Sequence, residues 1–65
     1  MDNHEYMEHL CYRVNDLYED AVKWKALMHK LPSEQERSMA KSIADMLFDQ
    51  YKKMSEMLTK KYNEM

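Results

Sequence analysis

Apolar residues recur with helical spacing through the first half of the chain. Between residues 7 and 31 they follow alternating steps of three and four, the heptad pattern that lays one stripe along a helix. The pattern predicts a helix over residues 3–30, with Asp2 or Asn3 as its N-cap. This first stripe consists of Met7, Leu10, Val14, Leu17, Ala21, Trp24, Met28 and Leu31.

A second apolar stripe runs through the other half and predicts a helix over residues 34–63. Its steps of three, four and four are closer to an eleven-residue repeat than to a heptad, so we expect little supercoiling there. Met39 and Met46 flank the stripe on one side, and Ala44 and Phe48 on the other. The stripe consists of Ala40, Ile43, Leu47, Tyr51, Met54, Leu58, Tyr62 and Met65.

The break between the two stripes falls at the only proline of a chain without glycine. Pro32 lacks an N–H and cannot continue a helix that arrives from its N-terminal side. Ser33 is a favourable N-cap, and Glu36 lies three residues later, which is the spacing of a capping box. The sequence therefore predicts a turn at residues 31–33 and a single all-α domain, an antiparallel helical hairpin.

Each predicted helix is apolar over more than one stripe. Tyr6, Cys11, Tyr18 and Leu27 border the first stripe, so one neighbouring helix cannot cover the apolar surface. A homodimer that forms a four-helix bundle is the simplest remedy, with a higher oligomer or a hetero-complex as alternatives. The predicted core and dimer interface comprises Met7, Leu10, Val14, Leu17, Trp24, Met28, Ile43, Leu47, Tyr51, Met54 and Leu58.

Charge and composition narrow the setting of the protein. The net charge is −2, and each predicted helix is acidic at its start and basic at its end, which complements the helix dipole. No apolar run reaches the length of a membrane span, so we expect no membrane partner. The acidic N-terminus has no signal-peptide pattern, and Cys11 is the only cysteine, so we expect a reducing cytoplasm.

Few residues are arranged for chemistry. His4 with Glu8, and Glu5 with His9, are helical pairs that could hold a metal from one face, but a solvated first turn explains them better. We interpret Cys11 as a small buried thiol. No nucleophile stands beside a base, and without glycine no phosphate-cradling loop is expected. The sequence therefore predicts no enzyme: no catalytic residue, no cofactor and no metal site.

Binding remains as the function, and the sequence offers two surfaces for it. Tyr12, Met39 and Met46 are candidate contacts to a protein partner, although the methionines also suit a dimer interface. The leading hypothesis is a small regulatory or adaptor protein, for instance an inhibitor, that binds another protein. The alternatives are an N-terminal metal-binding bundle and a dimer that binds RNA or DNA. The candidate phosphate contacts are Lys52, Lys53, Lys60 and Lys61.

Two helices of similar length, a tight turn and an expected dimer give a layout that resembles the Rop family, RNA-binding four-helix bundles that regulate plasmid copy number. The likeness concerns layout alone. No motif is shared, so no functional residue is transferred, and a shared fold by itself does not define a function.

Overall fold

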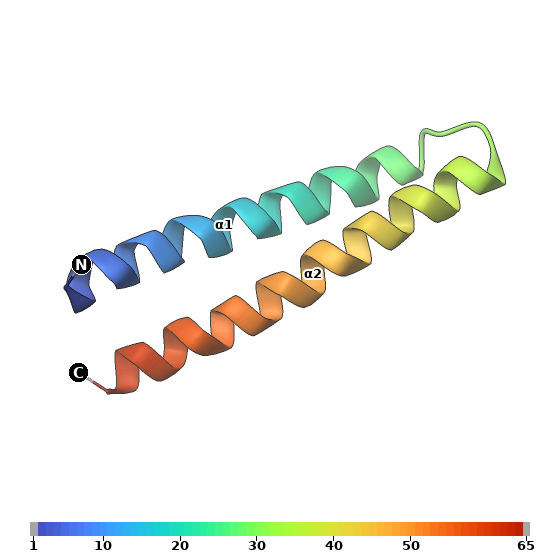
Figure 1. The fold of residues 1–65 in the computed structure, drawn as a ribbon. Coiled ribbons are helices and arrows are strands. Elements are labelled where there is room, and N and C mark those ends of the chain that lie inside the picture. The colour runs from blue at the N-terminus through green and yellow to red at the C-terminus, as the bar shows by residue number, and fades with distance from the viewer. Residues whose placement is uncertain (1, 65) are drawn as a thin grey trace.

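The chain folds as an antiparallel helical hairpin in the computed structural model, which describes residues 2–64. Helix α1 spans Asn3–Met28 and helix α2 spans Glu34–Asn63. The helices lie side by side with both chain ends at one end of a rod of 48 × 14 × 14 Å (Figure 1). This arrangement confirms the predicted helical hairpin.

The turn is longer than predicted, because α1 ends at Met28 instead of Lys30. Lys30 N–H donates to the Leu27 carbonyl oxygen at 2.9 Å, so the last turn of the helix tightens before the chain leaves it. Pro32 then prevents the helix from resuming. Across the turn, Arg37 Nη1 donates to the Leu31 carbonyl oxygen at 2.9 Å, which ties the first turn of α2 to the segment before it.

Both helices begin at the residues that the sequence indicates. Asp2 Oδ1 accepts the Glu5 N–H at 2.8 Å, and Ser33 Oγ accepts the Glu36 N–H at 3.1 Å. Each bond satisfies one of the backbone donors that a helix start leaves free. Among residues 2–64 no backbone needs a positive φ angle, which is why a chain without glycine can make this turn.

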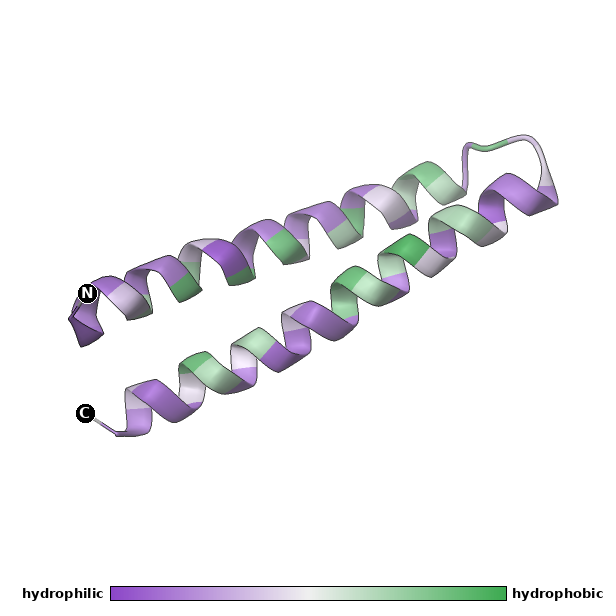
Figure 2. Cartoon of the chain, in the orientation of Figure 1, coloured by the Kyte–Doolittle hydropathy of each residue, from purple (hydrophilic) through white to green (hydrophobic). Residues whose placement is uncertain are grey.

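The core lies between the helices and is narrow. Hydrophobic segments of α1 gather along the edge that faces α2 (Figure 2). Leu17 is the largest fully buried side chain. The remaining members of the first stripe are half-buried, so the stripe is confirmed as the packed side of α1. Among residues 2–64 the buried residues are Leu10, Leu17, Ala21, Ala40 and Ala44.

The packed side of α2 differs from the predicted stripe. Tyr62, which was predicted to pack, is 71% exposed. The packed position after Leu58 is Lys61, whose Nζ lies 5.7 Å from the centre of the Tyr6 ring. Ala44 is fully buried beside the half-buried Ile43. The packed positions therefore follow a heptad, and the eleven-residue repeat was wrong; Met65, its last member, lies outside the described residues. They are Ala40, Ala44, Leu47, Tyr51, Met54, Leu58 and Lys61.

Candidate functional site

The hairpin is one layer of two helices, so it has two broad faces that its own chain does not cover. One carries mainly aromatic side chains and is called the aromatic face: Cys11, Tyr18, Val22, Phe48 and Tyr62. The other carries mainly methionine and aliphatic side chains and is called the methionine face: Tyr6, Leu27, Met39, Ile43, Met46 and Met57.

The aromatic face is organised around Tyr18 at the middle of the hairpin. The Tyr18 ring lies edge-on to Phe48, with centroids 6.3 Å apart, and 5.3 Å from the centroid of Tyr51. Such tilted aromatic pairs add about 0.5–1.5 kcal/mol beyond the area they bury. Tyr18 is nevertheless 48% exposed. A shallow groove continues from this cluster past Cys11 and Leu58 towards the chain ends.

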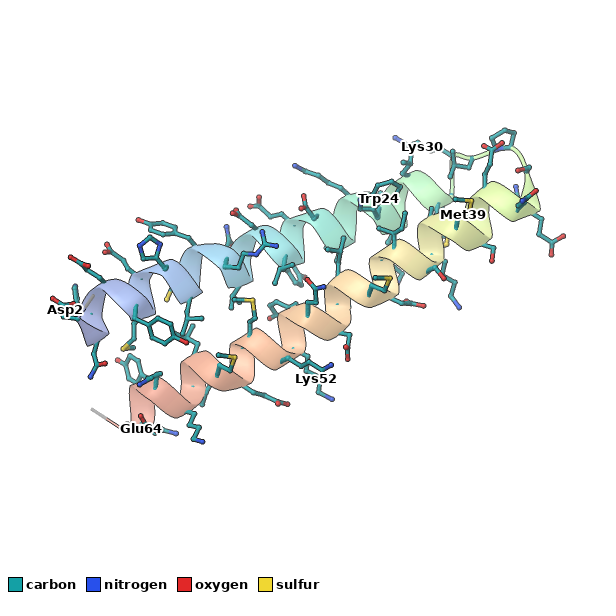
Figure 3. The ribbon with its side chains drawn as sticks, in the orientation of Figure 1. Asp2, Trp24, Lys30, Met39, Lys52 and Glu64 are labelled. Carbon is teal, nitrogen blue, oxygen red and sulfur yellow. The ribbon has the colours of Figure 1, made fainter. Side chains whose placement is uncertain are left out.

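The methionine face is most apolar near the turn. There Trp24 and Leu27 of α1 and Met39 and Ile43 of α2 line one groove. Trp24 and Met39 come from opposite helices at this end of the hairpin (Figure 3). Met46 follows Met39 by seven residues, so it continues the same row. Met39 and Met46 are 61% and 64% exposed, unusual values for unbranched apolar side chains in a chain with so small a core.

The candidate contacts to a protein partner do not all lie together. The structure brings Met39 and Met46 to one face, as their spacing implies. Tyr12 lies on the outer side of α1, away from both faces, and is 66% exposed. Met57, which is 47% exposed, belongs with the methionines near the chain ends, where Tyr6 and Lys60 line a second groove with it.

The four candidate phosphate contacts do not form one basic ridge. Lys53 Nζ lies 3.0 Å from Asp49 Oδ2, and Lys61 Nζ lies 3.7 Å from Glu64 Oε2. Lys52 and Lys61 are nine residues apart, which places them on opposite sides of a helix at about 100° per residue. Lys52 lies on the outer side of α2 (Figure 3). Only Lys53 and Lys60, seven residues apart, share a row.

The N-terminal cluster provides no complete metal site within residues 2–64, where no group of three or more His, Cys, Asp or Glu side chains is placed to hold an ion. His4, Glu8 and Cys11 do line one groove with Met7 and Tyr62. The prediction that Cys11 is buried was wrong, because its thiol lies on the uncovered aromatic face.

Sequence reasoning missed the cluster of Tyr18, Phe48 and Tyr51. Tyr18 was recognised as a flanking residue of α1, and Phe48 as a flanking residue of α2. Which flank of one helix meets which flank of the other depends on the register across the turn. That register is a property of the packed hairpin, and a stripe on one helix does not contain it.

The geometry therefore defines a two-helix hairpin with two uncovered faces. Comparison of the chain with protein-family models, with curated proteins and with solved structures finds no match in any of the three. Neither helix within residues 2–64 combines the length and the apolarity that crossing a membrane requires.

Proposed function

We propose that the chain is a small non-enzymatic regulatory or adaptor protein, which forms a homodimeric four-helix bundle and binds another protein through a helical face. The observation that carries this proposal is the pair of uncovered faces. When two hairpins stack, each covers one face of the other. The second face of each hairpin then stays available to a target.

The surface area of the chain supports the homodimer. Its accessible surface is 5281 Å², whereas a compact monomer of 8.0 kDa exposes roughly 4,450 Å². The excess of about 800 Å² equals the area that each partner contributes to a standard protein interface. The radius of gyration, 14.9 Å, also exceeds the roughly 10.7 Å of a compact domain of this length. A second hairpin would supply the missing layer.

The exposed groups suit a protein target better than a small molecule. They are large side chains spaced along helices, as Tyr18 and Val22 are on α1, and they border shallow grooves instead of an enclosed cavity. Helices of other proteins dock on such surfaces through apolar anchors one turn apart. The proposal places this interaction in the cytoplasm, where the Cys11 thiol stays reduced.

Light scattering over a dilution series tests the homodimer. We expect a mass near 16 kDa, twice that of the 8.0 kDa chain. A monomer that keeps full helicity on circular dichroism at every concentration would contradict the bundle.

Capture experiments test the target. Immobilised wild-type protein, Val22→Glu and the control Glu56→Lys are exposed to an extract of the producing cells. Val22 lies on the aromatic face, whereas Glu56 lies on the outer side of α2. We expect a protein that wild type and control retain in equal amounts and that Val22→Glu loses. Equal retention of every captured protein by all three would exclude this face as the target site.

Nucleic-acid binding is the second candidate, and the row formed by Lys53 and Lys60 favours it. This row continues that of Met39 and Met46, so a dimer that leaves the methionine face open would present it twice. Phosphate contacts give an affinity that falls steeply with salt. The test is retention on heparin or RNA at low salt. Retention that a Lys53→Glu, Lys60→Glu variant loses would favour this candidate over a protein target, and a wild-type chain that elutes without retention would exclude it.

A further inference from the structure

We propose that a second copy of the chain docks on the methionine face as an antiparallel two-fold dimer, with the turn of each hairpin beside the chain ends of the other. This arrangement rests on the homodimer of the proposed function. It adds which face of each hairpin is buried, how the two hairpins are oriented and which residues meet.

The first support is a row of residues on α1 that is complementary to the same row of a second copy running in the opposite direction. The row lies at seven-residue steps along the methionine face and reads Tyr6, Arg13, Asp20, Leu27. A two-fold axis across the helix between residues 16 and 17 sets Arg13 against Asp20 of the second copy. The same axis sets Tyr6 against Leu27 of the second copy. Every contact occurs twice, so the dimer gains two ion pairs and two apolar pairs.

The second support is that both charged residues are available. Arg13 and Asp20 are exposed, and neither takes part in an ion pair within residues 2–64. They lie between the apolar ends of the row, where Tyr6 and Leu27 line the two grooves of the methionine face. Opposite charges that meet at the rim of an interface fix its register and accelerate association.

Helix α2 accepts the same operation. Because Tyr6 lies beside Lys61 and Tyr18 beside Tyr51, the middle of α1 is level with about residue 51 of α2. The axis then passes between Gln50 and Lys53, so that the Gln50 amide lies beside Lys53 of the second copy. Met46 on the turn side of the axis meets Met57 of the second copy on the other side, and Ile43 meets Lys60. Met46 and Met57, which the single hairpin exposes, are covered in this way.

The aromatic face is a poorer match to itself. The same operation there brings Glu8 against Lys25 and Cys11 against Val22, which is favourable. However, it sets the larger rings of Tyr18 and Phe48 against Asn15 and Ser55. Large apolar side chains would face small polar ones. The aromatic face therefore stays open for the target.

The alternative is a parallel dimer on the methionine face, with both turns at one end. In that arrangement α1 lies over α2 of the second copy. Arg13 then meets Met57, and Asp20 meets Gln50. Neither charge finds an opposite partner, so a reversal of either charge creates no new repulsion.

Charge reversal tests the inference. The dimer dissociation constant is measured by light scattering and by dilution circular dichroism for Arg13→Asp, Asp20→Arg, the double variant and the control Glu19→Arg. Glu19 lies on the outer side of α1 and carries the same charge as Asp20. We expect each single reversal to raise the Kd by about 10- to 100-fold, since it creates two like-charge contacts. The double variant should return to near the wild-type value, and the control should stay there.

A cysteine placed at the axis gives an independent readout. In a Cys11→Ser background, Gln50→Cys should form an intermolecular disulfide rapidly in an antiparallel dimer, because the two sulfurs lie beside the axis. Slow cross-linking, equal to that of the outward Glu56→Cys control, would overturn the antiparallel arrangement. The double charge variant keeps the test valid even where a single reversal unfolds the chain.

The outcomes separate this inference from the function on which it rests. A wild-type chain that is monomeric at every concentration overturns both. A wild-type dimer whose Kd is unchanged by the single reversals, or a double variant as weak as the singles, overturns the face and register alone. The homodimer of the proposed function survives that second result.

Discussion

The half of the hairpin near the turn and the half near the chain ends are packed in different ways. Near the turn, Ala21, Ala40 and Ala44 are 0–2% exposed, and their small side chains fill the space between the helices. Near the chain ends the packed positions carry longer residues, of which Leu10 is buried but Met54 and Leu58 remain half-buried. Figure 1 shows the two helices lying closer together at the turn than at the chain ends.

This difference in packing bears on how much each half of the hairpin contributes to the free energy of unfolding. Alanine lets two helix backbones approach, and closely packed atoms gain the most dispersion energy. The turn also brings neighbouring residues together at a small cost in loop entropy, whereas contacts near the chain ends close a long loop. We therefore expect the turn half to hold the hairpin together and the terminal half to open more readily.

The largest effect is expected from Leu17→Ala. Leu17 is 1% exposed at the middle of the hairpin, so its truncation leaves a cavity and should cost about 2–5 kcal/mol in the free energy of unfolding. Urea denaturation measures this loss. Leu58→Ala, in the terminal half, should cost less because the half-buried site can collapse. Equal losses for the two variants would show that the terminal half is packed as tightly as the middle of the hairpin.

A smaller effect is expected from Ala21→Leu, which adds volume where the helices are closest. Ala21 is 0% exposed, so the larger side chain should cost about 1–3 kcal/mol through strain and displaced backbone. The matched variant is Ser55→Leu in the terminal half, where the half-buried site should accept the change within about 0.5 kcal/mol. Thermal unfolding of both variants measures the two losses in stability. A loss for Ala21→Leu as small as that for Ser55→Leu would refute the expected difference.

The smallest effect is expected at the helix caps. Ser33→Ala removes the bond to the Glu36 N–H and should cost about 1 kcal/mol. That is a fall in Tm of roughly 4–8 °C for a domain of this size. Asp2→Ala removes the equivalent bond to Glu5, but it acts at the end that opens first, so we expect a lower Tm shift there. A larger shift for Asp2→Ala would reverse the comparison.

Local signals predicted the parts of the fold that depend on few residues. The turn follows from Pro32 and Ser33, and the packed side of α1 follows from an unbroken heptad. The packed side of α2 was predicted less well, because apolarity ranks Tyr62 above Lys61. In the structure Lys61 occupies this position, and its Nζ lies over the Tyr6 ring.

The candidate site was predictable only in part. The row of Met39 and Met46 follows from helical spacing, since both residues belong to one helix. The cluster of Tyr18 and Phe48 combines two helices, so it needed their relative register. The exposure of Cys11 likewise depends on which side of α1 the second helix leaves open.

Trp24 gives this molecule an optical property. It is the only tryptophan of the chain, it is half-buried, and it lies in the groove of the methionine face beside Leu27 and Met39. Indole emission shifts to shorter wavelength when water leaves its surroundings. Docking of a second hairpin on this face would thus change the fluorescence of an unlabelled protein, whereas occupation of the aromatic face alone would leave it nearly constant. The emission wavelength of Trp24 therefore distinguishes occupation of the methionine face from occupation of the aromatic face.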